Sequence, residues 1–126
     1  MARMLNAIGH IALVVKDPTR TAALFGSLFN ARIVQRIDAE GHHETFVRLG
    51  TTWFALVGAE VERPRTGDHI AFHVTQDVLE SVAEKLLAMS VEFMRARSNT
   101  ALYFFDYDNH VFELDTVDMD AELQNT

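Results

Sequence analysis

Two stretches of this chain match each other without a gap. Residues 9–15 (GHIALVV) align with residues 68–74 (DHIAFHV) at an offset of 59 residues, which places His10 opposite His69. A repeat of this kind indicates that one structural module occurs twice. The fold must therefore accommodate two similar halves within 126 residues, a length typical of one compact domain.

The first half has the hydrophobic pattern of a strand, a helix and three further strands. Residues 7–15 alternate with period two, which predicts a strand. Asp17 followed by Pro18 predicts a helix start, because an aspartate oxygen caps the first turn and proline is accepted at the first helical position. We expect this helix to end near Asn30. The strands that follow are predicted at 31–37, 44–49 and 51–58.

The second half repeats this order after a segment without periodicity. We interpret residues 60–67, which include Pro64 and Gly67, as a linker. Asp77 with Glu80 three positions later predicts a capping box at the start of the second helix. The strands of this half are predicted at 68–75, 91–95, 101–106 and 110–116. The chain then divides into a first module at 5–59, a second at 68–116, and a tail at 117–126 that we expect to end in a loose helical turn.

The order βαβββ, found twice, predicts an α+β fold of two tandem modules in a single domain. Each module would carry a helix on one face of a curved sheet and leave the other face open. Two such sheets side by side would form a half-open barrel lined by alternate strand residues. His10, His69 and Glu113 would converge there, because each lies opposite the apolar, helix-facing positions of its strand.

Two imidazoles and one carboxylate form the ligand set of a catalytic metal site. Such a set leaves coordination positions for water and substrate. The chain has no cysteine, so nitrogen and oxygen atoms must hold any metal. A single strand histidine is more often a core or surface residue than a ligand, but two at equivalent repeat positions favour the metal. His73 is predicted to share the cavity of His69, whereas His110, beside an aspartate-rich turn, is expected to brace that turn.

Charge and hydropathy exclude several classes of partner. The net charge is −7, and the 11 basic residues are scattered along the chain, which argues against nucleic acid and anionic membranes. No apolar run reaches the roughly 18 residues that a membrane-spanning helix needs. We therefore expect a soluble, uncleaved protein of the cytoplasm that acts on a small molecule.

Three segments resemble the vicinal oxygen chelate superfamily, which includes glyoxalase I, extradiol dioxygenases, bleomycin-binding proteins and fosfomycin resistance enzymes. The segments are 9–17, 68–72 and 102–114, and the last is similar to the tyrosine-to-glutamate strand pair of the fosfomycin resistance proteins, particularly those of the epoxide-hydrolase type. The resemblance implies a site in which Mn²⁺, or else Ni²⁺, Fe²⁺ or Zn²⁺, is held by His10, His69 and Glu113. It also implies a homodimer in which His10 completes the site of the other subunit.

The same resemblance draws attention to Glu44. This residue stands nine positions before Trp53, as does the carboxylate that the water-using members employ as general base. A carboxylate beside a metal can deprotonate water while the metal stabilises the alkoxide that leaves an opened epoxide. Phe54 lies at the first-half position that corresponds to Glu113 at the offset of 59, so the second carboxylate of a glyoxalase I site is missing. Trp53 and Phe54 suggest an apolar pocket wall instead.

The phosphonate-binding positions of the fosfomycin branch are only partly kept. Tyr103 is present, but Ala12 replaces a threonine and Glu122 replaces an arginine. A phosphonate needs donors and positive charge, so Arg48, Arg95 or Arg97 must compensate. The leading prediction is therefore a metal-dependent enzyme that opens an epoxide, or activates a similar small oxygenated substrate, with water as nucleophile. The alternatives are transfer of glutathione or another thiol to such a substrate, and a metal-free protein that sequesters a drug, as bleomycin-binding proteins do.

Overall fold

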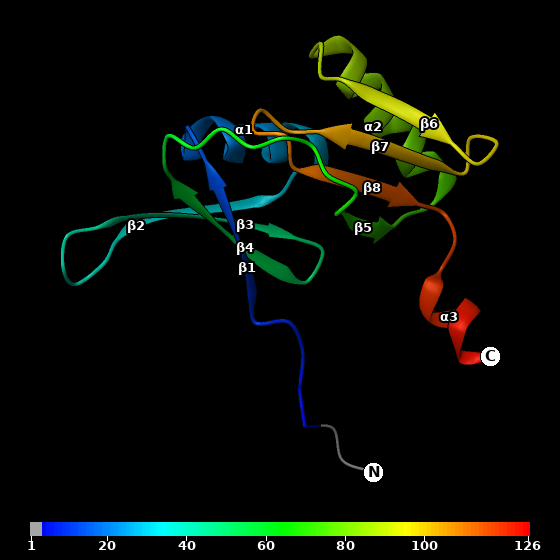
Figure 1. The fold of residues 1–126 in the computed structure, drawn as a ribbon, viewed down its shortest axis with the longest axis horizontal. Coiled ribbons are helices and arrows are strands. Elements are labelled where there is room, and N and C mark those ends of the chain that lie inside the picture. Colours follow the sequence, from blue (N-terminus) through cyan, green and yellow to red (C-terminus); the bar gives the residue numbers. More distant parts are fainter. Residues whose placement is uncertain (1–3) are drawn as a thin grey trace. The chain divides into compact units, whose positions relative to one another are not determined.

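A computed structural model of the chain describes residues 4–126. The chain divides into two compact units, which meet between Val61 and Glu62 and are described one at a time (Figure 1). The first unit contains β1 (His10–Val15), α1 (Pro18–Phe29), β2 (Arg32–Ile37), β3 (His43–Leu49) and β4 (Thr52–Gly58). The second contains β5 (Ile70–His73), α2 (Gln76–Ala88), β6 (Phe93–Ala96), β7 (Ala101–Phe105), β8 (Val111–Asp115) and α3 (Met119–Gln124).

The two units share one topology. The strand order is β1-β4-β3-β2 in the first sheet and β5-β8-β7-β6 in the second, and in each sheet only the first pair is parallel. The predicted α+β class and the repeated βαβββ order are confirmed. Each sheet is open, with β1 and β2 at the edges of one and β5 and β6 at the edges of the other. Within residues 4–126, no helix is long and apolar enough to cross a membrane.

In the first unit, α1 covers one face of the sheet. The helix begins where the Asp17 side chain accepts the backbone N–H of Arg20 at 3.1 Å, and it ends at Asn30 with a left-handed φ of 52°. Both ends agree with the sequence prediction, because aspartate is a strong N-terminal cap and asparagine tolerates the left-handed conformation. The core between sheet and helix consists of Leu13, Val15, Leu24, Phe25, Leu28, Val47, Leu49, Phe54 and Leu56.

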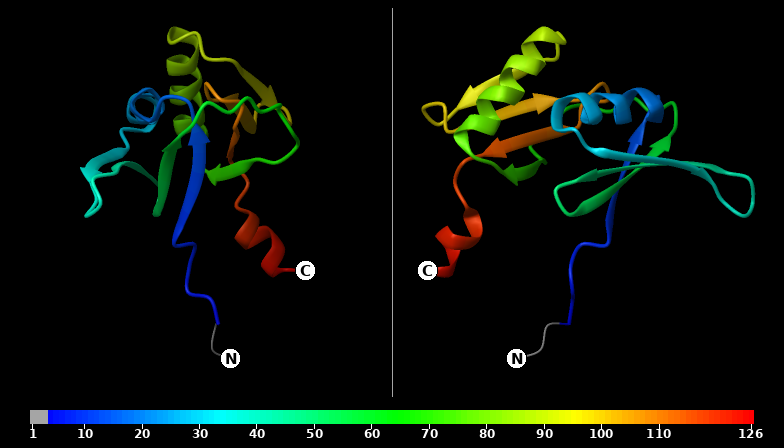
Figure 2. Two further views of the ribbon diagram at one scale, coloured as in Figure 1. Left: turned by 60° about the vertical axis from the view of Figure 1, so that its left-hand side comes forward. Right: turned by 180° about the vertical axis from the view of Figure 1, so that it is seen from behind.

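In the second unit, α2 lies across one face of the other sheet (Figure 2). Its start differs from the prediction. Thr75 is the capping residue, since its hydroxyl accepts the backbone N–H of Val78 at 3.4 Å. The predicted capping box was wrong because Thr75 already supplies the capping oxygen, which places Asp77 inside the first turn. Glu80 binds Arg95 of β6 instead.

His110 braces the turn between β7 and β8, as predicted. Its Nδ1 lies 2.7 Å from Oδ2 of Asp106, and both side chains are buried. Oδ1 of Asp106 accepts the backbone N–H groups of Asp108 and His110. These bonds satisfy the polar groups of a buried turn and set the start of β8.

Candidate metal centre

Glu113 is a buried carboxylate in the middle of the second sheet. It lies on the inner strand β8, in register with Ala71 of β5 and Tyr103 of β7. Its neighbours Phe112 and Leu114 are buried in the core on the α2 side, so the Glu113 side chain belongs to the opposite face. Only 5% of that side chain is exposed. A charge so thoroughly removed from water needs partners of opposite charge or good hydrogen bonds.

The partners of Glu113 are His69 and Arg97. Nε2 of His69 lies 3.1 Å from Oε1 of Glu113, and Arg97 donates a hydrogen bond to Oε2. Arg97 also lies 3.6 Å from Oδ2 of Asp115 and donates to the Tyr103 hydroxyl at 3.2 Å. The hydroxyl of Tyr103 and the carboxylate of Glu113 together raise the pKa of Arg97 above its usual range. The second unit thus brings together His69 and Glu113, the two ligands that the sequence analysis assigned to it.

The ring of His69 is oriented as in a metal-binding histidine. Its Nδ1 lies 3.0 Å from the carbonyl oxygen of Gly67. Because a carbonyl only accepts hydrogen bonds, Nδ1 carries a proton, and Nε2 is the ring nitrogen that faces Glu113. Metal-binding histidines generally fix their orientation in this way, through a hydrogen bond from the other ring nitrogen.

The spacing of these atoms fits a divalent ion. Nε2 of His69 and Oε1 of Glu113 are the atoms that would bind the ion, and they lie 3.1 Å apart. Two bonds of about 2.1 Å that meet at about a right angle would separate their ligand atoms by about 3 Å. A nitrogen and a carboxylate oxygen so placed match Mn²⁺, Fe²⁺, Ni²⁺ or Zn²⁺.

His10, the predicted third ligand, begins β1 in the first unit. It is exposed, and it lies on the face opposite the buried residues Leu13 and Val15, as the alternation predicts. Trp53 of β4 is its neighbour in register, and Arg48 of β3 is the next residue in the same row across the sheet. The guanidinium of Arg48 lies 5.9 Å from the centre of the Trp53 ring. His10 stays a predicted ligand on the open face of this sheet.

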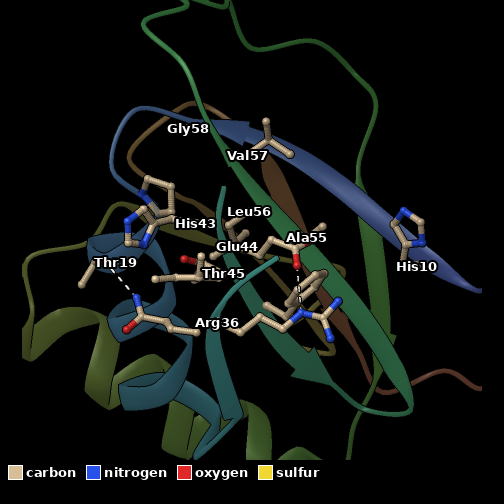
Figure 3. A pocket seen from close by; sticks show the side chains of 14 residues that line it. His10, Thr19, Arg36, His43, Glu44, Thr45, Ala55, Leu56, Val57 and Gly58 are labelled. Carbon is tan, nitrogen blue, oxygen red and sulfur yellow. Dashed lines mark hydrogen bonds and ion pairs between the residues drawn. The ribbon is translucent and has the colours of Figure 1, made fainter. Parts of the chain in front are cut away.

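Glu44 lies in a cavity of the first unit together with His10 (Figure 3). The cavity has a volume of about 1070 Å³, and β1, β3 and β4 contribute to its wall. Nε of Arg36 donates to Oε1 of Glu44 at 2.8 Å, and 30% of the Glu44 side chain is exposed. The cavity thus holds a carboxylate that solvent can reach, with one oxygen fixed by a guanidinium. Trp53 and His10 also line a smaller hollow of about 300 Å³.

The family follows from comparison with known proteins. Residues 7–114 match the model of the Glyoxalase/Bleomycin resistance protein/Dioxygenase superfamily. The chain belongs to this superfamily.

Within the superfamily, the chain is similar to fosfomycin resistance proteins. It is 27% identical to fosfomycin resistance protein FosX of Listeria innocua over 96% of this chain and 97% of that protein. A FosX variant from Listeria monocytogenes, crystallised with Mn(II) and 1S,2S-dihydroxypropylphosphonic acid, has a TM-score of 0.82 and 30% identity, covering 95% of this chain and 99% of that one. Metallothiol transferase FosB of Lysinibacillus sphaericus is 25% identical over 89% of this chain and 83% of its own length.

The structure corrects one predicted pocket residue, Phe54. Its side chain is fully buried and lies in register with Ile11 and Val47, within the core beneath α1. The repeat register explains the error. Ala12 pairs with Ala55 as Ala71 pairs with Glu113, so the true counterpart of Glu113 is Ala55.

The two halves therefore differ by one residue between their parallel strands. This shift could not be seen from the matching β1 and β5 segments alone. Ala55 carries no ligand atom, so the superfamily's glyoxalase I arrangement with a second carboxylate is still disfavoured in this chain.

Arg95 is the second correction. It lies in register with the fully buried Leu102, and both its terminal nitrogens bind Glu80 of α2 at 3.0 Å. Arg95 therefore lies on the helix-facing side of the sheet and not beside Glu113. The arginine that reaches Glu113 is Arg97, which the sequence analysis named only among three candidate cations. No periodicity could single it out, because Arg97 follows β6 in a tight turn.

The remaining predicted substrate-binding residues keep their assigned faces. Tyr103 lies in register with Glu113, and its ring meets the His69 ring edge-on with 5.5 Å between centres. His73 ends β5 in register with Asp115 and is exposed. Both residues share the open face of the second sheet with Glu113.

Proposed function

We propose that this chain is a divalent-metal-dependent enzyme that opens the epoxide ring of fosfomycin, or of a similar small oxygenated substrate, by addition of water. The proposal rests on the pair of His69 Nε2 and Glu113 Oε1, an imidazole nitrogen and a carboxylate oxygen that lie 3.1 Å apart on an open sheet face. The similarity to FosX proteins over nearly the whole chain supports it.

His10, His69 and Glu113 would hold the ion, with Mn²⁺ favoured. A bound divalent ion supplies Lewis-acid stabilisation for the oxygen that leaves the opened ring. Two of these residues are fixed by their surroundings: Nδ1 of His69 donates to the carbonyl oxygen of Gly67, and Glu113 is buried on an inner strand.

Glu44 is the proposed general base. Arg36 fixes Oε1, so Oε2 is the oxygen that we assign to take a proton from water. The oxygen of that water attacks an epoxide carbon and the ring C–O bond breaks. The ring oxygen then takes up a proton, which gives a vicinal diol.

Arg48, Trp53, Tyr103 and His73 are the proposed substrate-binding residues. Arg48 lies on the same face of β3 as Glu44 and could pair with an anionic group of the substrate. The proposal also includes a cytoplasmic homodimer whose subunits share each metal site, as the resemblance implied. Ala12 and Glu122 do not supply the donors of a standard phosphonate pocket, so affinity for fosfomycin is expected to be lower than for a smaller or less charged epoxide.

Phosphorus NMR of fosfomycin incubated with Mn²⁺-loaded protein tests the reaction. We expect the diol to form without added thiol, and Glu44→Gln to lower the rate by at least about 100-fold, the usual scale of general-base catalysis. Glu40→Gln, in the exposed β2–β3 turn, is the matched control and should not affect the rate.

Two results would replace this proposal. Product formed only with glutathione or another thiol, at a rate that Glu44→Gln leaves unchanged, would indicate a thiol transferase, an activity that the similarity to FosB favours. Stoichiometric binding of an antibiotic by metal-free protein without turnover would indicate a sequestering protein.

A further inference from the structure

Arg97 covers a carboxylate that solvent barely reaches. The side chain of Arg97 is 48% exposed, whereas those of Glu113 and Asp115 are 5% and 12% exposed. The guanidinium contacts Glu113, Asp115 and the Tyr103 hydroxyl at once. It therefore lies on the solvent side of the same carboxylate that the proposed function assigns to the metal.

The backbone that carries Arg97 is strained. Arg97, Ser98 and Asn99 are consecutive residues with left-handed φ values of 49°, 55° and 66°, and none of them is glycine. Each such residue costs free energy, and the conformation persists only where the surrounding structure enforces it. Strain of this kind is common at functional sites and suggests that the turn has a purpose beyond joining β6 to β7.

Hydrogen bonds from side chains of α2 and from Thr100 enforce this turn. Gln76 donates to the carbonyl oxygen of Asn99 at 2.9 Å, and the Asn99 amide donates to Glu80 at 2.8 Å. The Thr100 hydroxyl donates to the carbonyl oxygen of Arg97 at 2.7 Å. These bonds hold the start of the Arg97 side chain in place, while its free end spans three acceptors.

An ion held by His69 Nε2 and Oε1 of Glu113 would share one carboxylate with the guanidinium of Arg97, which donates to Oε2. Two like charges within a few ångströms repel strongly where water is largely excluded. Asp115, two residues further along β8 and on the same face, offers Arg97 a carboxylate to which it can retreat, since the two already lie 3.6 Å apart.

We propose that Arg97 is an internal cation that neutralises Glu113 in the metal-free protein, and that a divalent ion must displace it toward Asp115 in order to bind. The inference rests on the proposed function, because it takes Glu113 as a metal ligand. The observed metal affinity is then lower than the intrinsic affinity of the ligands, because binding must break the Arg97–Glu113 pair.

Titration of Mn²⁺, with free Mn²⁺ followed by electron paramagnetic resonance, tests this without any activity measurement. Arg97→Gln is expected to bind Mn²⁺ about 10-fold more tightly than the unmodified protein, within the usual range of coupling between two binding events. Arg65→Gln is the matched control, because Arg65 is a half-exposed cation of the same unit that pairs with Glu92. Its affinity for Mn²⁺ should equal that of the unmodified protein.

Thermal unfolding separates displacement from a general effect of charge. Without metal, Arg97→Gln should melt below the unmodified protein, because Glu113 loses its cation. Addition of Mn²⁺ should raise the melting temperature of Arg97→Gln by more than it raises that of the unmodified protein. If Arg97→Gln does not fold without metal, Arg97→Lys takes its place. A lysine lacks the planar fork that reaches three acceptors, so tighter Mn²⁺ binding than in the unmodified protein is again expected.

Several results would overturn the inference. One is an Mn²⁺ affinity in the Arg97 variant that equals or falls below that of the unmodified protein. Another is a gain in Mn²⁺ affinity in Arg65→Gln that equals the gain in Arg97→Gln. Failure of every variant to bind Mn²⁺ would reject the proposed function as well, whereas tight binding that is insensitive to Arg97 would reject this inference alone.

Discussion

At the scale of single residues, the site depends on Glu113. Replacing Glu113 by Gln keeps the shape of the side chain but removes the charge that both a metal ion and Arg97 require. We expect Mn²⁺ affinity to fall by more than about 100-fold, because changes to the outer partners of metal ligands already cost 10–100-fold. Equilibrium dialysis with elemental analysis measures the loss. Retained stoichiometric Mn²⁺ would show that Glu113 is not a ligand.

Residue-level prediction succeeded where strand alternation decides the outcome. His10, His69 and Glu113 lie opposite the core-facing residues of their segments because the side-chain period of a strand is two. It failed for Phe54, since a repeat offset measured on one strand need not hold on the next. It also did not single out Arg97, whose role depends on a left-handed turn that no local pattern in the sequence predicts.

At the scale of elements, Glu80 and Arg95 join α2 to β6. Arg95 and then Asn99 and Gln76 lower the pKa of Glu80 from its ordinary 4.5 to about 2. A carboxylate with a depressed pKa stabilises the folded state fully above its unfolded pKa, and this contribution is lost as the pH falls toward the folded value.

Glu80→Gln should therefore melt below the unmodified protein at pH 7, and the difference should shrink between pH 4.5 and pH 2. Thermal unfolding followed by circular dichroism across this range measures it. Glu84→Gln, at an exposed position of the same helix, serves as the control. A difference in melting temperature that stays constant down to pH 2 would contradict the assignment.

The start of α2 shows where element prediction is limited. The helix itself follows from its apolar stripe, but two nearby residues, Thr75 and Asp77, could each serve as its cap. Only the observed backbone, extended at Thr75 with φ −78° and ψ 161°, decides between them. At α1, where Asp17 precedes a proline, the sequence leaves no such ambiguity.

At the scale of the whole molecule, the repeat predicted the fold because each half alone specifies a βαβββ module. The open sheet faces carry the predicted ligands. His10 lies on the first sheet, Glu113 lies on the second, and His69 directly precedes β5 of the second sheet. The proposed homodimer makes a specific demand on these residues, since each site would take His10 from one subunit and the other two ligands from the second.

Mixing two inactive variants tests whether each metal site takes its ligands from both subunits. His10→Ala and Glu113→Gln, unfolded and refolded together in equal amounts, should recover about a quarter of the metal sites, because half of the dimers are mixed and each has one intact site. Each variant refolded alone gives the baseline. Recovery no greater than that baseline would place all three ligands of a site within one chain.

The ligand set is tested most directly by anomalous X-ray diffraction from crystals grown with Mn²⁺. We expect one strong peak per chain, bonded at about 2.1 Å to atoms of His10, His69 and Glu113, with Arg97 displaced from Oε2 of Glu113. Another group of suitable composition, Asp38, Glu40 and His42, lies in the β2–β3 turn. A peak there with none at Glu113 would disprove the ligand set, and a Glu113 still paired with Arg97 in the presence of saturating Mn²⁺ would disprove the displacement of Arg97.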